Sequence, residues 1–417
     1  MSGLRSYILV TAAYWAFTLT DGALRMLVLL HFHNLGYTPV ELAFLFVFYE
    51  LSGVITNLVG GFVAARLGLR ATLLGGLALQ VVALGMLALL DPDWGRFASV
   101  AYVMSAQALS GIAKDLTKMS AKSAIKVLVP AGADSSLFKW VAVLTGSKNA
   151  LKGVGFFLGG LLLGALGFRD SLLAMAAGIL VALVFSTASL PRELGKAKGK
   201  AKFRQMFSTS REVNVLSAAR FFLFGARDIW FVVGVPVFLA TRFAWGFMEV
   251  GGFLAAWVIG YGIIQAITPL LVRWFTRGHA PQGRSATVLA FLLALVIVGV
   301  ILGLEAGYRA DLLLVIGLGV FGIVFALNSA VHSYLILAYS DGDKVTMNVG
   351  FYYMANAGGR LAGTVLSGVM YQQWGLTGCL GASAAFAVAA AVLALALPST
   401  SRTFELPRGG SADQGGD

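Results

Sequence analysis

Long apolar segments indicate the fold of this chain, because a helix formed by each of them would be about long enough to span a lipid bilayer. A membrane-spanning helix needs roughly 20 mainly apolar residues, whereas a membrane β-strand needs about 10 residues of alternating polarity. The segments are of the first kind, and twelve can be delimited: 7–31, 38–64, 71–90, 97–114, 141–166, 171–190, 213–240, 247–272, 286–304, 311–337, 345–371 and 377–397. We therefore predict an all-α integral membrane protein with twelve transmembrane helices.

The composition agrees with a membrane protein and argues against a nucleic-acid partner. Charged residues make up 12% of the chain, compared with about 25% in soluble proteins. The formal net charge is +12, which in a soluble protein would suggest nucleic-acid binding. We attribute it instead to basic loops on one side of the membrane and to basic residues inside the bundle. The first apolar run is too long for a signal-peptide core, so we interpret it as a retained helix.

The distribution of basic residues predicts the orientation of the chain. If the N-terminus is cytoplasmic, about 21 of the 31 Lys and Arg residues fall in cytoplasmic segments and about six within spans. The few in outside loops are Arg96, Arg169, Arg242 and Arg309. Because cytoplasmic loops carry the excess of positive charge, we expect both termini on the cytoplasmic side.

A long basic connection divides the apolar segments into two sets of six. We predict an N-terminal six-helix half (1–190), a cytoplasmic linker (191–212), a C-terminal six-helix half (213–397) and a disordered cytoplasmic tail (398–417). The linker contains Gly and many Lys residues, and the tail is rich in Gly, Ser and Pro, compositions that do not form a packed core.

The two halves share residues at a constant offset of 207 positions. The matching pairs are Asp21 and Asp228, Arg66 and Arg273, Asn149 and Asn356, and Ala150 and Ala357. Parallel six-helix repeats are typical of the major facilitator fold. The stretch Gly61–Arg70 also resembles the loop between the second and third helices of that superfamily, although Ala65 stands where the superfamily has an acidic residue.

Basic residues inside the predicted spans are the best candidates for a binding site. A charge at the centre of a bilayer costs roughly 3 kcal/mol on the insertion scale, so such residues face the bundle interior. Six are found, in the first, fifth, seventh and eleventh spans: Arg25, Lys148, Lys152, Arg220, Arg227 and Arg360. Asn149 and Asn356 lie beside them. Arginine and lysine bind phosphate and carboxylate oxygens, so we predict an anion site built from these eight residues.

Carboxylates inside the spans are fewer, and they admit two roles. Asp21, Glu50 and Asp228 could be fixed counter-ions that pair with the cations, or they could carry protons for coupling. Asp21 and Arg25 lie four residues apart on one helix and could form an ion pair. Glu50 has no basic neighbour on its own helix and is the preferred proton carrier.

A second basic pattern follows the fourth apolar segment. Its lysines recur every four residues: Lys114, Lys118, Lys122 and Lys126. One interpretation is an amphipathic surface helix that contacts anionic lipid headgroups. The other is an electropositive entrance that attracts anions from the cytoplasm.

The sequence contains no signature of a disulfide, a metal site, a nucleotide-binding loop or an enzyme active site. Cys379 is the single cysteine, which excludes an intramolecular disulfide and a cysteine-based metal site. His31 and His33 are spaced wrongly for one helical face, and no P-loop, metal-ligand cluster or nucleophile motif occurs. We therefore expect no cofactor and no enzymatic activity, and transport that is secondary and not ATP-driven.

Four longer strings resemble one transporter family. They are DGALRMLVLLHFHNLGYTP (Asp21–Pro39), SGIAKDLTKMSAKSAIK (Ser110–Lys126), LFKWVAVLTGSKNALKGVGFFLGG (Leu137–Gly160) and GFYYMANAGGRLAGTVLSG (Gly350–Gly368). The chain resembles the organoarsenical efflux permeases of arsenic-resistance operons, which are major facilitator proteins. The resemblance covers most of the chain outside the linker and the tail.

The resemblance implies a substrate and a location. The family is associated with export of 1-arseno-3-phosphoglycerate, which forms when a partner glyceraldehyde-3-phosphate dehydrogenase uses arsenate in place of phosphate. It implies arsenate resistance and a monomeric protein in the bacterial cytoplasmic (inner) membrane. Two alternatives stay open from the residues alone. One is an antiporter or importer of another organic phosphate or carboxylate, and the other is a non-transporting membrane sensor or scaffold.

Overall fold

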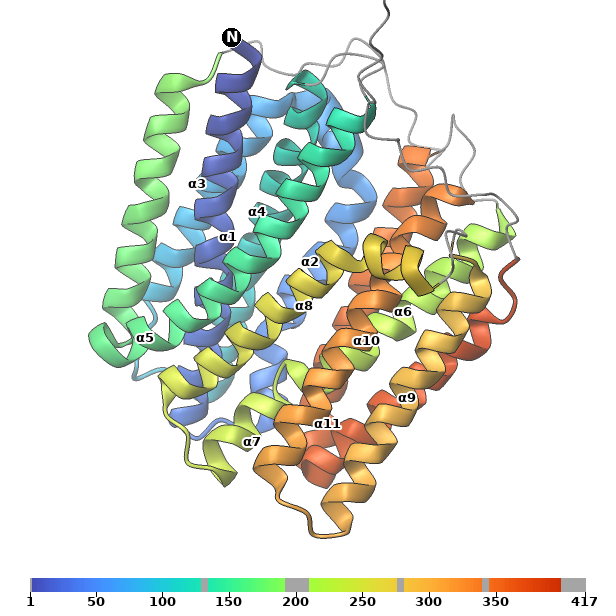
Figure 1. Cartoon of the computed structure of the whole chain (residues 1–417). Helices are drawn as coiled ribbons and strands as arrows, with labels where there is room; N and C mark the ends of the chain where they lie inside the picture. The colour runs from blue at the N-terminus through green and yellow to red at the C-terminus, as the bar shows by residue number, and fades with distance from the viewer. Residues whose placement is uncertain (1, 129–133, 192–209, 276–280, 340–344, 399–417) are drawn as a thin grey trace, which may run out of the picture.

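The computed structural model describes residues 2–128, 134–191, 210–275, 281–339 and 345–398, and the regular elements within these ranges are all helices (Figure 1). The N-terminal half contains α1 (Ser2–Asn34), α2 (Pro39–Leu67), α3 (Leu69–Ala88), α4 (Arg96–Leu128) and α5 (Asp134–Ser189). The C-terminal half contains α6 (Arg211–Phe231), α7 (Gly234–Arg242), α8 (Phe247–Phe275), α9 (Gly283–Glu305), α10 (Ala310–Ala338) and α11 (Val345–Ala394). The predicted tail and all but the ends of the predicted linker lie outside the described residues.

Two of these helices turn back on themselves and therefore cross the bundle twice. Gly167 in α5 has φ 76°, and Gly375 in α11 has φ 62°. Both values lie in the left-handed region, which glycine adopts without steric cost. Each glycine thus marks a reversal between two antiparallel helices, and Figure 1 shows the reversal of α5 beside its label.

The helices fit the twelve predicted spans. Eight stretches of the described chain are long and apolar enough to cross a membrane, and two of them contain the reversals at Gly167 and Gly375. The helices α6 and α7 together form a single span, Arg211–Arg242. The more polar helices α1 and α4 are 33 residues long and complete the set. The chain is a multi-pass membrane protein.

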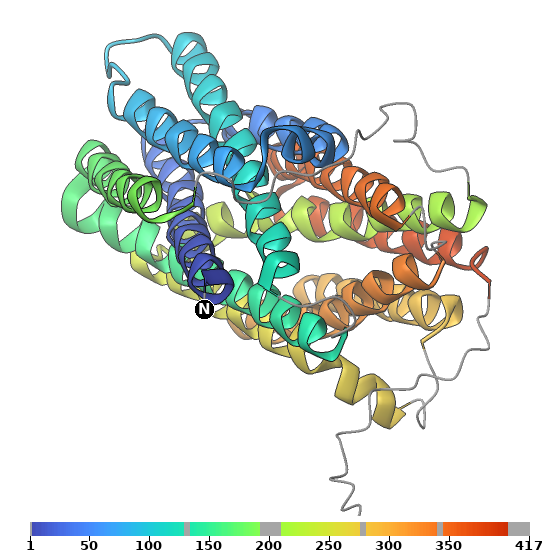
Figure 2. The ribbon, with the colours of Figure 1, turned by 90° about the horizontal axis from the view of Figure 1, so that it is seen from above.

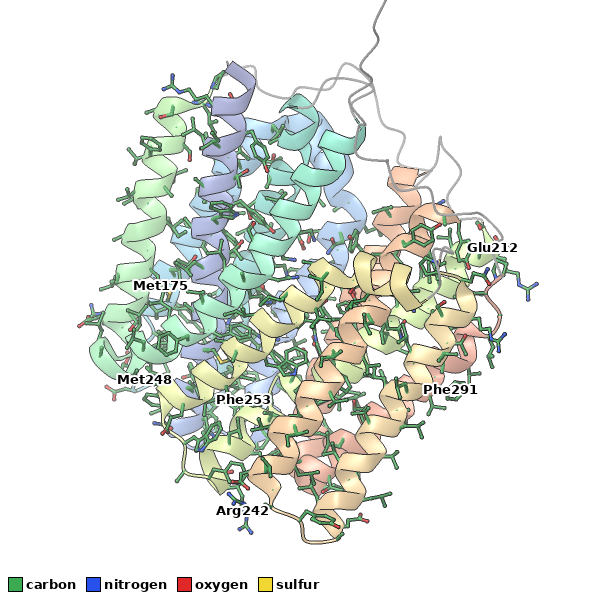
Figure 3. The ribbon with its side chains drawn as sticks, in the orientation of Figure 1. Met175, Glu212, Arg242, Met248, Phe253 and Phe291 are labelled. Atoms are coloured by element: carbon green, nitrogen blue, oxygen red, sulfur yellow. The ribbon has the colours of Figure 1, made fainter. Side chains whose placement is uncertain are left out.

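The outer surface of the bundle is apolar, as expected for a protein that lies in lipid. On α9, Phe291 is 40% exposed and Leu295 is 67% exposed. Figure 3 shows Phe291 on the outer side of the helix, and Glu212 and Arg242 at opposite ends of the span that α6 and α7 form. Large apolar side chains that face outward over a whole helix are stabilised by contact with lipid tails.

The two halves lie side by side and contact each other through two helix pairs. The first part of α5 packs against α8, and α2 packs against the first part of α11. Figures 1 and 2 show the blue and green helices of the N-terminal half on one side and the yellow to red helices on the other. Within the halves, α5 also packs on α1, and α11 packs on α6.

Glycines on α5 allow its close approach to both neighbours. A Cβ atom at Gly159 would clash with the carbonyl oxygen of Ala23 on α1, and one at Gly160 would clash with that of Phe247 on α8. Small residues of this kind let helix backbones approach closely in membranes. The apolar part of α5 that follows Lys152 therefore packs against both α1 and α8.

Gly159→Ala is expected to destabilise the protein by about 1–3 kcal/mol, because the added methyl group overpacks a backbone contact that cannot move freely. The measurement is the thermal unfolding midpoint of the purified protein. Gly164→Ala on the same helix is the matched control, since its Cβ would meet only the Phe247 ring, at 3.9 Å. Equal midpoints for the two variants would contradict this account of the packing.

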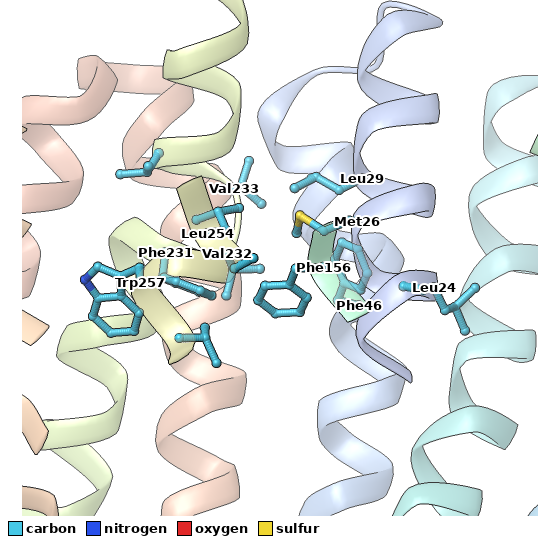
Figure 4. Close-up of a cluster of buried hydrophobic side chains, with 14 of the residues drawn as sticks. Leu24, Met26, Leu29, Phe46, Phe156, Phe231, Val232, Val233, Leu254 and Trp257 are labelled. Carbon is cyan, nitrogen blue, oxygen red and sulfur yellow. The ribbon is translucent and has the colours of Figure 1, made fainter. Parts of the chain in front are cut away.

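An apolar layer closes the interior between the halves. In Figure 4, Phe156 of α5 lies between Phe231 and Val232 on one side and Met26 and Phe46 on the other. The ring centroids of Phe156 and Phe231 are 6.0 Å apart. These side chains belong to one continuous core that both halves share.

The structure corrects one expectation about α4. The apolar segment was predicted to end at Lys114, with a separate surface helix after it, but α4 continues without a break to Leu128. Asp115 is 1% exposed and Thr117 is 0% exposed, so this part of α4 is packed inside the bundle. The surface-helix interpretation is wrong for Lys114 and Lys118, and the side chains of Lys122 and Lys126 lie outside the described residues.

Candidate functional site

A chain of charged side chains crosses the interior from one half to the other. In the N-terminal half, Arg25 Nη1 lies 3.2 Å from Glu50 Oε1. The same carboxylate oxygen lies 2.6 Å from Arg360 Nη2 of α11. Arg360 Nε also lies 3.2 Å from Asp228 Oδ2 of α6, whose Oδ1 lies 2.5 Å from Arg227 Nη2. The contact between Glu50 and Arg360 is therefore an ion pair between the two halves.

Among these linked charged side chains, the cations outnumber the carboxylates. Three guanidinium groups share two carboxylates, because Glu50 and Asp228 each serve two arginines. The possible ion pair between Asp21 and Arg25 does not form. Asp21 Oδ1 instead accepts a hydrogen bond of 2.6 Å from the Tyr49 hydroxyl, while Arg25 turns toward α2. Arg25 thus pairs with a carboxylate on another helix and not with the carboxylate on its own helix.

Two lysines add positive charge without forming an ion pair with a described residue. No described carboxylate oxygen lies within 4.0 Å of the Nζ atom of Lys152 or Lys114. The ammonium of Lys152 lies 5.7 Å from the centroid of the Phe156 ring, and that of Lys114 lies 3.9 Å from the Tyr49 ring. Both side chains are partly exposed within the bundle. Such ammonium groups are available to an anion between the halves.

The charged chain and the apolar layer are adjacent along three helices. Leu29, Phe156 and Phe231 each follow a charged residue by four positions, namely Arg25, Lys152 and Arg227. On these helices the apolar residue lies one turn farther from the end of the bundle where the chain begins. The apolar layer thus covers the charged chain on the side away from the N-terminus.

A second network joins the halves through neutral side chains and Arg220. Asn149 Nδ2 on α5 donates to Gln265 Oε1 on α8 over 3.0 Å, and Gln265 Nε2 donates to Ser329 Oγ on α10 over 3.4 Å. The Ser329 carbonyl oxygen accepts from Arg220 Nη1 over 3.1 Å. Arg220 Nε donates to Asn356 Oδ1 over 3.1 Å. Asn149 and Asn356, predicted as equivalent positions, therefore lie at opposite ends of one hydrogen-bonded chain.

Arg220 is buried without an acidic partner among the residues that the structure describes. It is 4% exposed, and its Cζ atom lies 3.9 Å from the centroid of the Phe224 ring and 5.0 Å from that of Tyr352. Cation–π contacts of this kind partly replace hydration of a guanidinium. Lys148, one turn before Lys152 on α5, is half-buried.

The structure also shows a polar cluster that the sequence did not predict. Lys118 Nζ lies 2.7 Å from Asp115 Oδ1 and 2.9 Å from Asn57 Oδ1, and Thr56 Oγ1 donates to Asp115 Oδ2 over 2.5 Å. This cluster joins α2 to α4. The spacing of Asp115 and Lys118, three residues apart on one helical face, was the signal in the sequence.

The histidines at the end of α1 have a packing role. The ring of His31 stacks on Phe168 at 4.0 Å between centroids. His33 lines a pocket of about 210 Å³ with Leu30, Asn34, Ala240, Trp245, Gly246 and Phe247. That pocket contains none of the predicted anion-site residues. Among the described residues, no group of three His, Cys, Asp or Glu side chains is placed to hold a metal ion.

Two six-helix halves that meet around buried charges define a membrane carrier. The chain belongs to the Major Facilitator Superfamily, whose family model matches residues 7–333. Members of this family are secondary transporters, and the chain is therefore a secondary transporter. No curated protein sequence matches the chain.

Solved structures with the same fold are distant in sequence. A POT family transporter in complex with 5-aminolevulinic acid has a TM-score of 0.72 and 13% identity, over 93% of this chain and 94% of that chain. A POT family transporter in complex with a thioalcohol-conjugated peptide has a TM-score of 0.71 and 14% identity over the same shares. At these identities the comparison shows the fold alone.

Proposed function

We propose that the protein exports an organic arsenate or phosphate anion, 1-arseno-3-phosphoglycerate, and so confers arsenate resistance. The observation that carries the proposal is the excess of cations between the halves. Arg25, Arg227 and Arg360 share two carboxylates, and Lys152 and Lys114 have no acidic partner within 4.0 Å among the described residues. Uncompensated charge inside a membrane protein is costly, and a bound anion compensates it.

The chemistry of the cations suits a substrate with several negative charges. Guanidinium groups bind phosphate and arsenate oxygens through two parallel N–H donors, and an ammonium adds a point charge. The arsenate and phosphate ends of 1-arseno-3-phosphoglycerate supply the negative charges. The resemblance of four long strings to organoarsenical permeases supports this substrate over other organic phosphates.

The site suggests how binding is coupled to movement of the halves. Arg360 connects the halves through Glu50, and the apolar layer around Phe156 separates the charged chain from the end of the bundle away from the N-terminus. An anion on Lys152 and Arg360 competes with Glu50 for the guanidinium. It thereby weakens the ion pair between the halves and favours their rocking about the midplane.

Secondary transport is supported over a sensor or scaffold role by membership of the Major Facilitator Superfamily. We further propose a monomer in the bacterial inner membrane, with both termini cytoplasmic and a glyceraldehyde-3-phosphate dehydrogenase supplying the substrate. The export then runs from the end of the bundle where the chain begins.

Uptake into everted membrane vesicles tests the proposal. Vesicles that contain the protein are supplied with labelled glyceraldehyde 3-phosphate, arsenate, NAD and the dehydrogenase. Accumulation of label that requires both arsenate and the dehydrogenase is the expected result. Accumulation of another organic phosphate without arsenate would support the alternative antiporter or importer. No accumulation of any such anion would overturn the proposal.

We propose Glu50 as the proton carrier, with Asp21 and Asp228 as the other acidic groups of the coupling network. Protonation of Glu50 removes the charge that holds both Arg25 and Arg360. Glu50→Gln is therefore expected to abolish the pH dependence of efflux, measured as initial rate against vesicle pH. Glu41→Gln on the same helix is the matched control, because Glu41 pairs with Arg96 on another part of the molecule. An unaltered pH profile in Glu50→Gln would reject this assignment.

A further inference from the structure

Of the 13 buried side-chain atoms that lack a hydrogen-bond partner among the described residues, seven lie in the C-terminal half. Within the described ranges they include both side-chain atoms of Asn328, Nδ1 of His332, the hydroxyl of Tyr352 and Oγ of Ser217. Each of these residues is at most 1% exposed. Buried polar groups in folded proteins are almost always hydrogen-bonded, and lipid offers no substitute. Unpaired buried atoms in one region are therefore available to bind a polar ligand.

These side chains belong to one cluster around Arg220. The rings of Phe224 on α6 and Phe325 on α10 lie 5.1 Å apart, and Arg220 Nη1 donates to the Ser329 carbonyl oxygen. The two helices therefore run in opposite directions where they meet. Ser217, which precedes Arg220 on α6, thus lies toward His332, which follows Ser329 on α10.

Two further side chains complete the cluster. Asn328 directly precedes Ser329 and lies four residues before His332, on the same side of α10. From α11, the Tyr352 ring lies 5.0 Å from the Arg220 Cζ atom. The cluster thus draws on three helices, α6, α10 and α11.

The chemistry of the cluster is that of an oxyanion site. Arg220 supplies a positive charge without a described carboxylate partner, and its Nη2 makes none of the described hydrogen bonds. The Asn328 amide and the Tyr352 hydroxyl are additional donors that make none of the described hydrogen bonds. A guanidinium flanked by neutral donors is the usual arrangement for carboxylate, phosphate or arsenate oxygens.

We propose that Arg220, Asn328 and Tyr352 form a second anion subsite, which binds the second acidic group of a two-ended substrate. This inference rests on the proposed function, in which Lys152 and Arg360 hold the first acidic group. The two subsites are adjacent, because Arg220 donates to Asn356, which lies four residues, or about 6 Å of helix, before Arg360. The substrate class is a short-chain organic acid with an acidic group at each end.

Binding of two stable compounds to the purified protein tests this subsite. 3-Phosphoglycerate has acidic groups at both ends, and glycerol 3-phosphate lacks the carboxylate. Wild-type protein is expected to bind 3-phosphoglycerate roughly tenfold more tightly, as measured by equilibrium dialysis. Asn328→Leu should bring the two dissociation constants together without changing that of glycerol 3-phosphate. Lys152→Met should weaken the binding of both compounds.

Two further variants keep the test independent of misfolding. Tyr352→Phe removes a single hydroxyl and is expected to reduce the preference partly. Gln107→Leu is the matched control, because Gln107 is equally buried, has an unpaired Nε2 and lies in the N-terminal half. It should keep the wild-type preference.

The possible outcomes separate the two proposals. If wild-type protein binds neither compound, the proposed function fails. If it binds both and Asn328→Leu and Tyr352→Phe keep the wild-type preference, the proposed function stands. In that case the unpaired atoms are satisfied by water, and the second subsite is rejected.

Discussion

Lys152→Met should reach the membrane in normal amount and should export the arsenylated substrate roughly 100-fold more slowly than wild type. The ammonium has no described acidic partner within 4.0 Å, so its removal leaves no described carboxylate unpaired. Methionine keeps the length of the side chain. The anion loses one charged hydrogen bond of about 1.5–3 kcal/mol in a site shielded from water. The measurement is the initial rate in everted vesicles, normalised to the amount of protein.

Two variants serve as controls for this prediction. Lys152→Arg keeps the positive charge and should retain a substantial part of the rate. Lys118→Met removes an ammonium that is paired with Asp115, and it should lower the thermal unfolding midpoint because a buried carboxylate loses its partner. A wild-type export rate in Lys152→Met would show that this ammonium does not bind the substrate.

The sequence predicted the helices well because the bilayer fixes their length. Apolar runs of about 20 residues placed the spans, and the short interruptions near Gly167 and Gly375 coincide with the reversals of α5 and α11. The end of α4 was missed because charge was taken to end a span. Asp115 and Lys118 neutralise each other inside the bundle, so the helix continues past them.

The partners of the buried charges could not be predicted in the same way. Sequence spacing identifies neighbours on one helix, and on that basis Asp21 was a possible partner of Arg25. The structure pairs Arg25 with Glu50 on the next helix and pairs Glu50 with Arg360, 310 positions later. Contacts between helices depend on how the helices pack, which the spacing of charges does not determine.

Arg360→Lys should reduce export roughly 100-fold, although it keeps the positive charge, and Arg360→Met should reduce it further. Arg360 binds Asp228 through Nε and Glu50 through Nη2, so it uses two separate donors of the guanidinium. A lysine ammonium is a single point donor and cannot reproduce this geometry. Arg360→Lys loses one charged hydrogen bond of about 1.5–3 kcal/mol, whereas Arg360→Met loses both.

Arg25→Lys is the matched control, because Arg25 binds Glu50 through Nη1 only, at 3.2 Å. One ammonium can replace that single contact, and the variant should export at a rate near that of wild type. In Arg360→Met, Glu50 keeps Arg25 and Asp228 keeps Arg227, so the protein should still fold, as its unfolding midpoint would show. A wild-type rate in Arg360→Lys would mean that charge alone matters at this position. The simultaneous binding of Glu50 and Asp228 by one guanidinium would then have no part in transport.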